Sequence, residues 1–131
     1  MMGASYSHKP TILCIDDAEV VLRVRKLVLA SAGYSIITAQ SGEEGLELFK
    51  KTPFDLVIAD HFLTDKTGTE IAREMKEAKP EVPILIVSGA IEKPVGIEFA
   101  DAFFSKGEGP EPLLAAIADL LKKDVIGSRP H

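Results

Sequence analysis

A buried strand that ends on a carboxylate is the feature that most constrains this chain. Residues 56–59 are all apolar, they lie shortly after Pro53, and Asp60 follows them directly. A run of four or five apolar residues is typical of a strand that is buried on both faces of a sheet. Open α/β folds hold their ligands at the carboxyl ends of such strands, so Asp60 is a candidate functional residue. Taken alone, Asp60 could also be a helix-capping or turn aspartate.

The composition excludes several classes of protein. The chain has 131 residues, 46% hydrophobic and 27% charged, which predicts one globular domain. The net charge of −5 shows no excess of basic residues that could bind the phosphates of a nucleic acid, so we expect no direct nucleic-acid binding by this chain. No apolar run approaches the ~20 residues of a membrane span, so we expect no membrane insertion. The single cysteine, Cys14, lies in an apolar pattern and fits a packed thiol in a reducing compartment, which predicts a cytoplasmic protein.

Short apolar strands alternate with helical patterns five times along the chain. The expected strands are residues 11–15, 35–39, 56–60, 84–88 and 102–105. Capping boxes over 41–44 and 67–70 begin two helices, and Pro112 begins the last one. This alternation predicts a doubly wound α/β fold, with a parallel sheet between two layers of helices. Pro94 and Gly96 leave room for only one or two helical turns, so we expect a shortened fourth helix.

The ends of the folded domain and its first helix complete the expected layout. We expect a loose leader over residues 1–10, the domain over 11–123 and a polar tail over 124–131. Five apolar residues of the first helix recur at spacings of three and four and are expected to face the core: Val20, Val21, Val24, Leu27 and Val28. Three basic residues are expected on its solvent side: Arg23, Arg25 and Lys26.

Polar side chains stand at the ends of four of these strands: Asp16 and Asp17, Asp60, Ser88 and Lys106. Each has an ordinary alternative explanation, as a helix cap, a loop hydrogen bond or a solvated surface charge. The carboxyl ends of parallel strands share one edge of the sheet, however. Their joint placement therefore indicates a site.

The charges of this cluster require a partner. Two carboxylates ~4 Å apart repel by roughly 4 kcal/mol at an effective dielectric constant of ~20. The negative charge of the three carboxylates therefore exceeds the positive charge of the one lysine. Either a carboxyl group stays protonated or a hard divalent cation binds. Mg²⁺ suits such a site because it accepts one or two carboxylates and keeps positions open for a phosphate. Asp60 is then a candidate nucleophile of the aspartyl-phosphate type.

In this order and spacing the residues resemble the response-regulator receiver domains of two-component signalling, the CheY-like family. The resemblance covers the chain from about Thr11 to Lys122. The matching residues are Asp16 and Asp17, Asp60, Gly68 eight residues later, Ser88, Phe103 and Lys106. It implies the flavodoxin-like (βα)5 fold with strand order 2-1-3-4-5. It also implies a signalling domain, not a classical enzyme, which catalyses only its own phosphotransfer and dephosphorylation.

The resemblance also implies a role for each residue. Asp60 would accept a phosphoryl group from a sensor histidine kinase or a histidine phosphotransfer protein, and the phosphorylated domain would then bind an unknown downstream protein. Mg²⁺, with Mn²⁺ as an alternative, would be held by Asp16, Asp17, Asp60 and the backbone carbonyl of Phe62. Lys106 and Ser88 would contact the phosphoryl oxygens. Phe103 would be the switch aromatic, whose rotamer follows Ser88.

The sequence departs from the family pattern in three places. Thr64 and Gly107 stand where prolines are usual, and the interval from Ser88 to Lys106 is about one helical turn short. An altered output surface is therefore expected. His61, beside Asp60, could tune access to the phosphoryl site or its pH response, but a residue at this position is more often simply exposed, and that is what we expect.

Two other functions stay open on the sequence. One is a receiver-like interaction module that is not phosphorylated; the acidic cluster and Lys106 weigh against it. The other is a Mg²⁺-dependent hydrolase with an aspartate nucleophile. Haloacid dehalogenase-type enzymes usually carry a second aspartate two residues after the first, where this chain has Phe62.

Overall fold

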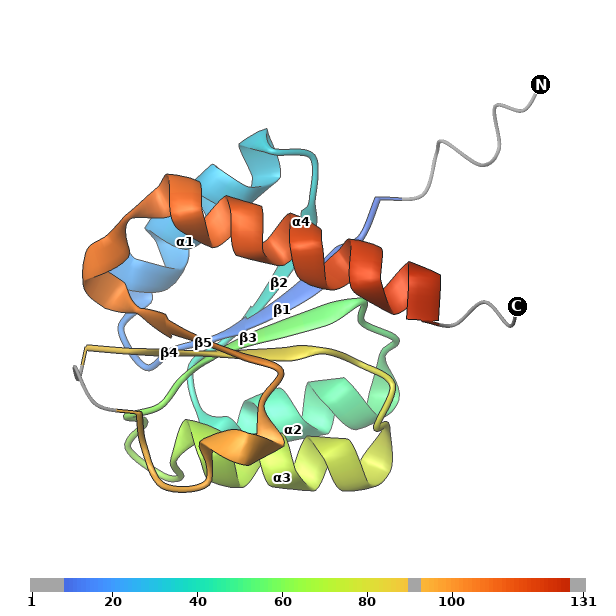
Figure 1. Ribbon diagram of the computed structural model, residues 1–131. Helices are drawn as coiled ribbons and strands as arrows, with labels where there is room; N and C mark the ends of the chain where they lie inside the picture. The colour runs from blue at the N-terminus through green and yellow to red at the C-terminus, as the bar shows by residue number, and fades with distance from the viewer. Residues whose placement is uncertain (1–8, 90–92, 128–131) are drawn as a thin grey trace.

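A five-stranded parallel sheet forms the centre of the computed structural model, which describes residues 9–89 and 93–127 (Figure 1). Its strands are β1 (Thr11–Ile15), β2 (Ser35–Ala39), β3 (Leu56–Asp60), β4 (Ile84–Ser88) and β5 (Ala102–Ser105). They lie in the order β2-β1-β3-β4-β5, as predicted. All five residues of β3 and of β4 are buried, which agrees with strands covered on both faces.

Two pairs of helices cover the two faces of the sheet. The helices are α1 (Glu19–Ser31), α2 (Gly42–Lys51), α3 (Gly68–Ala78) and α4 (Pro110–Gly127). Figure 1 shows α1 and α4 on one face and α2 and α3 on the other. Each face has its own core: Phe49, Ile71 and Met75 pack under α2 and α3, whereas Leu29 and Ile117 pack under α1 and α4. The doubly wound fold is therefore confirmed.

The expected caps form at α2 and α3. The Ser41 hydroxyl accepts a hydrogen bond from the Glu44 N–H at 3.0 Å. The Glu44 carboxylate accepts from the N–H of Gln40, one residue before the cap, and not from that of Ser41. The box at Thr67 and Glu70 is complete in both directions. These caps fix the starts of both helices beside the carboxyl edge of the sheet.

The fourth crossover carries only a short helical segment, as predicted. In its described part, residues 93–101, the helical structure is a 3-10 turn, η2 (Ile97–Phe99), in place of a short α-helix. Gly96 enters this turn with a φ of 87°, a left-handed conformation that glycine adopts without strain. A second 3-10 turn, η3 (Lys106–Glu108), follows β5. The last helix begins at Pro110, before Pro112, and includes residues 124–127, which we expected to belong to the tail.

The face that α1 presents to the core was predicted wrongly. Leu22 and Leu29 are its buried residues. Three residues expected in the core are instead 66%, 55% and 69% exposed: Val20, Val24 and Leu27. Arg25, expected in solvent, has a side chain only 10% exposed. Apolar residues cover more than one side of this helix, so spacings of three and four fit two overlapping faces and do not select between them.

Two further expectations concern Cys14 and the membrane. Cys14 is fully buried in β1, and burial raises the pKa of its thiol to about 12, so it is an inert packed thiol. None of the helices in the described ranges is long and apolar enough to cross a bilayer.

Candidate functional site

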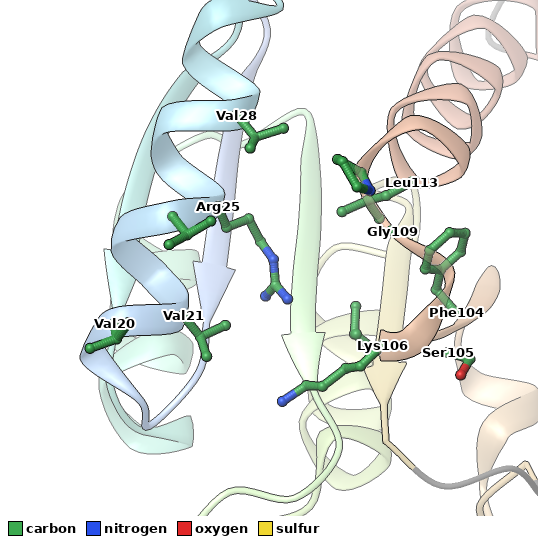
Figure 2. Close-up of a pocket in the computed structure, with 12 residues that line it drawn as sticks. Val20, Val21, Arg25, Val28, Phe104, Ser105, Lys106, Gly109 and Leu113 are labelled. Atoms are coloured by element: carbon green, nitrogen blue, oxygen red, sulfur yellow. The ribbon is translucent and has the colours of Figure 1, made fainter.

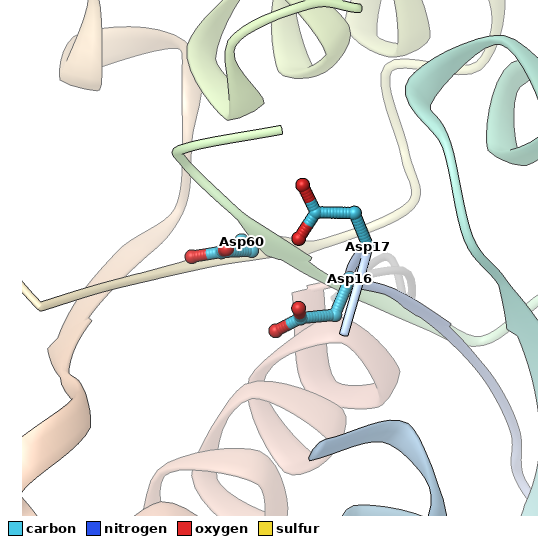
Figure 3. A group of neighbouring side chains, drawn as sticks. All are labelled: Asp16, Asp17 and Asp60. Carbon is cyan, nitrogen blue, oxygen red and sulfur yellow. The ribbon is translucent and has the colours of Figure 1, made fainter. Parts of the chain in front are cut away.

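Three carboxylates meet at the carboxyl edge of the sheet, where β1 and β3 end beside each other (Figure 3). Asp16, Asp17 and Asp60 each offer one oxygen, and these oxygens all lie within 4.8 Å of one another. Asp16 and Asp60 are buried, whereas Asp17 is exposed. The Ala18 N–H donates to Asp16 Oδ1 at 2.9 Å and orients this carboxylate. The arrangement gives a hard cation several anionic oxygens within reach from one open side.

Lys106 brings a positive charge to this cluster from η3. Its Nζ lies 3.4 Å from Asp60 Oδ1 and 3.5 Å from Asp16 Oδ2. Asp60 Oδ1 is buried and accepts no well-aligned hydrogen bond within the described residues. One ammonium group therefore faces two buried carboxylates, and one buried oxygen keeps free acceptor capacity.

The environment raises the pKa of the Asp60 carboxyl above its ordinary value. Burial is the main cause, the charge of Asp16 adds to it, and Lys106 opposes both. Folding therefore disfavours the ionised form of Asp60 relative to the unfolded chain. The stabilisation that the raised Asp60 pKa gives to the folded state is complete below the ordinary carboxyl pKa. It is lost as the pH rises through the folded-state pKa. A divalent cation would relieve this cost, so the residues present fit Mg²⁺.

Ser88 ends β4 at this edge, whereas Phe103 lies two residues before the end of β5. Ser88 is fully buried at the end of β4, the strand next to β3. Phe103 pairs in register with Ile86 and is partly buried beside Ile97 and Ala100. Phe62, whose carbonyl is a predicted metal ligand, is bridged to Thr67 across the loop after β3. The structure thus brings Asp16, Asp17, Asp60 and Lys106 together at one edge of the sheet, with Ser88 at the end of the neighbouring strand. Phe103 lies further back in β5, and the roles of all these residues remain predictions.

His61 is buried, not exposed as expected. Its ring packs edge-on against Phe62 with centroids 4.8 Å apart, and its Nδ1 finds no hydrogen-bond partner in the described part of the chain. Burial lowers the pKa of the imidazole, opposed by the charges of Asp60 and Glu70.

Arg25 is the residue near this site that sequence reasoning missed. Its Nη1 lies 3.9 Å from Asp16 Oδ2, the oxygen that Lys106 also approaches. Its position in the sequence was only a weak indication of burial. Arg25 lies three residues after Leu22 and four before Leu29, so it falls on the same side of the helix as these two leucines.

Gly68 allows the close approach of α3 to the end of β3. A Cβ at this position would lie 2.7 Å from the carbonyl oxygen of Asp60 and 2.9 Å from Cα of His61. Both are backbone atoms, which cannot move aside cheaply. Gly68→Ala is therefore expected to lower the free energy of unfolding in urea by about 1–3 kcal/mol. Gly107→Ala is the matched control, because a Cβ there meets no atom of the described residues within 4 Å. An equal loss of unfolding free energy in both variants would contradict this account of Gly68.

The comparisons with known proteins agree with the fold. A family model described as the response regulator receiver domain matches residues 12–118. The chain therefore belongs to the response regulator receiver domain family, whose members serve in two-component systems as signalling domains.

The curated relatives are larger proteins. The transcriptional regulatory protein GlrR of Escherichia coli K12 is 34% identical over 122 residues, which cover 89% of this chain and 28% of GlrR. The cell cycle response regulator CtrA of Brucella abortus is 33% identical over 116 residues, covering 86% of this chain and 50% of CtrA. The chain thus spans between about a quarter and half of the length of these relatives.

Solved structures of similar shape are receivers too. A CheY-like receiver domain protein from Methanospirillum hungatei superposes with a TM-score of 0.87 at 27% identity, covering 92% of this chain and 100% of the other. The response regulator TrrA from Thermotoga maritima, solved in complex with Mg²⁺ and BeF, has a TM-score of 0.81 at 28% identity. That match covers 85% of this chain and 98% of TrrA.

Proposed function

We propose that this chain is a phosphorylatable receiver in which Asp60 accepts a phosphoryl group from a sensor histidine kinase or a histidine phosphotransfer protein. A carboxylate oxygen of Asp60 attacks phosphorus, the phosphorus–nitrogen bond of the phosphohistidine breaks, and the imidazole leaves with the bonding electron pair. The observation that carries this proposal is the buried Asp60 Oδ1, which has no well-aligned hydrogen bond from the described residues and lies 3.4 Å from Lys106 Nζ, beside two further carboxylates.

The same residues suit a metal ion. Asp16, Asp17, Asp60 and the carbonyl of Phe62 would hold Mg²⁺, or Mn²⁺ in its place, which offsets the negative charge of the carboxylates and the phosphoryl group. The Mg²⁺–BeF complex of TrrA supports this assignment by similarity. Lys106 would pair with the phosphoryl oxygens once they replace its contact with Asp60.

The proposed output is a change in protein–protein binding, inside the cytoplasm, toward a downstream protein of unknown identity. A phosphoryl group brings close to two negative charges and three strong acceptors. Each hydrogen bond to a charged group is worth about 1.5–3 kcal/mol. Reversing a two-state population from 1:99 to 99:1 takes roughly 5.5 kcal/mol, which two or three such bonds nearly supply.

Phosphoryl transfer from a small phosphodonor tests this function directly. The full chain is incubated with acetyl phosphate and Mg²⁺, and the modified residue is mapped by mass spectrometry after borohydride reduction of the acyl phosphate. We expect modification at Asp60 that disappears when EDTA removes the metal. Modification elsewhere, or none at all, would favour the interaction module that is not phosphorylated.

Ser88→Ala is expected to separate phosphorylation from switching. The variant should still accept a phosphoryl group on Asp60, but without the hydroxyl it loses one bond that the active state requires. Hydrogen exchange with and without beryllofluoride measures the response. In the wild type we expect the largest changes in the segment from Gly89 to Ala100, of which residues 90–92 lie outside the described structure, and in the Phe103 strand. An equal response in Ser88→Ala would show that the switch does not depend on Ser88.

A further inference from the structure

An open pocket of about 420 Å³ lies between α1 and α4 (Figure 2). Its walls are mostly apolar, with valines from α1, Val87 from β4, Phe104 from β5 and Leu113 from α4. The volume falls within the range of small-molecule sites, roughly 300–1,000 Å³. Such sites combine apolar walls with a few polar groups that converge on the ligand.

Three polar residues line this pocket, Arg25, Ser105 and Lys106, and Arg25 is the more buried of the two basic ones. Figure 2 shows its side chain extending from α1 into the space between the helices, on the side where Lys106 lies. The side chain is nine-tenths buried, and its Nη1 has no hydrogen-bond partner among the described residues. Its ion-pair contact there, with Asp16 Oδ2, is long at 3.9 Å. A buried guanidinium left with unused donors calls for an acceptor.

The charges around Arg25 limit the chemistry of that acceptor. The planar guanidinium matches the two oxygens of a carboxylate. Lys106 already contacts Asp16 and Asp60, so Arg25 is the positively charged residue of the pocket that is available to bind a ligand. A doubly charged anion would meet the nearby carboxylates with only one such cation to balance it. A single carboxylate on an apolar body fits both the charge and the walls.

We propose that the pocket between α1 and α4 binds a monocarboxylic acid with an apolar body. The ligand carboxylate accepts hydrogen bonds from the Arg25 guanidinium, and its hydrocarbon part lies against the valines of α1, Phe104 and Leu113.

The pocket is coupled to the acidic cluster through Arg25, and this part of the proposal rests on the proposed metal site. A ligand carboxylate neutralises the cation beside Asp16, which lowers its repulsion of Mg²⁺. Mg²⁺ at Asp16 in turn weakens the attraction between the Asp16 carboxylate and Arg25. Each ligand therefore strengthens the binding of the other, by the same factor in both directions.

Three probes of equal chain length test the site: octanoate, octan-1-ol and octylammonium. Their dissociation constants are measured on the full chain by following the methyl resonances of the pocket valines. We expect octanoate to bind at least tenfold more tightly than octan-1-ol, and octylammonium more weakly than either. In saturating Mg²⁺ the dissociation constant of octanoate should fall at least threefold.

Arg25→Leu provides the decisive variant, because it keeps an apolar side chain in the helix and removes the guanidinium. It should weaken octanoate binding at least tenfold and leave octan-1-ol binding unchanged, whereas Arg25→Lys should lose only part of the affinity. Arg23→Leu is the matched control, since Arg23 lies on the same helix, is exposed and pairs with Glu19 at 3.6 Å. Octanoate binding should be unchanged in this control.

Several results would overturn the proposal. Equal affinities for octanoate and octan-1-ol would reduce the pocket to an unspecific apolar surface, and unchanged octanoate binding in Arg25→Leu would exclude the guanidinium. Methyl shifts caused by an amphipathic helical peptide but not by octanoate would assign the pocket to a protein partner. Octanoate binding should persist in Asp60→Asn, so failure of the proposed phosphotransfer is distinguishable from failure of this site. An octanoate affinity that does not respond to Mg²⁺ would refute the coupling.

Discussion

Asp60→Asn is expected to abolish the incorporation of phosphate from acetyl phosphate in the presence of Mg²⁺. The amide lacks the anionic oxygen that attacks phosphorus, and no partial activity is expected from an isosteric residue of this kind. Mass spectrometry of the intact chain measures the loss. Asp119→Asn makes the same change of charge at an exposed position of α4 and should be labelled like the wild type. Undiminished labelling of Asp60→Asn would remove Asp60 from its proposed role.

The same substitution has a second expected effect, on stability. Because burial and Asp16 raise the pKa of Asp60, the ionised carboxylate destabilises the metal-free fold at neutral pH. Asp60→Asn should therefore unfold at a higher denaturant concentration than the wild type when EDTA is present. This difference should shrink as the pH falls below the folded-state pKa, since both side chains are then neutral. A wild type more stable than Asp60→Asn at pH 7 without metal would contradict the charge assignment.

The sheet and the polar residues at its carboxyl edge were predictable because local patterns determine them. Four- and five-residue apolar runs specify strands buried on both faces, and the polar residue that ends each run falls at the carboxyl edge of the sheet. Asp16, Asp60 and Ser88 occupy that edge as expected. The caps at Ser41 and Thr67 likewise depend on residues within one helical turn.

The orientation of α1 was not predictable in the same way. Its valines and leucines satisfy helical spacing on two overlapping faces, and the choice depends on what α4 and the sheet present to the helix. Burial of Arg25 follows from that choice, and so does exposure of Val20 and Val24. His61 was misjudged for a related reason, because its burial depends on contacts with Phe62 and the loop that bridges to Thr67.

The fourth crossover shows how a shortened segment changes the surface near the switch aromatic. Ile97 and Ala100, from the η2 turn and the residue after it, pack with Phe103 against the core under α2 and α3. Phe99 of the same turn lies 5.9 Å from the Arg73 guanidinium of α3, a cation–π distance. A receiver with a full fourth helix would present a longer helical surface here than the η2 turn does.

Asp17→Ala is expected to reduce the affinity for Mg²⁺ at least tenfold, because it removes one of the three carboxylates that meet at the sheet edge. Asp17 suits the test better than Asp16, which also orders the backbone at Ala18 and faces two basic side chains. Asp17 is exposed and makes no hydrogen bond or ion pair with the described residues.

The metal-free Asp17→Ala variant should be no less stable than the wild type, since the substitution also relieves repulsion between carboxylates. Calorimetric titration with Mg²⁺ measures the affinity, and urea unfolding in EDTA measures the stability. Glu19→Gln is the control, because Glu19 is an exposed acid two residues away that pairs with Arg23. It alters the net charge by the same amount, so a general electrostatic effect would weaken Mg²⁺ binding in both variants. Unchanged Mg²⁺ affinity in Asp17→Ala would show that the metal, if it binds, does not use this carboxylate.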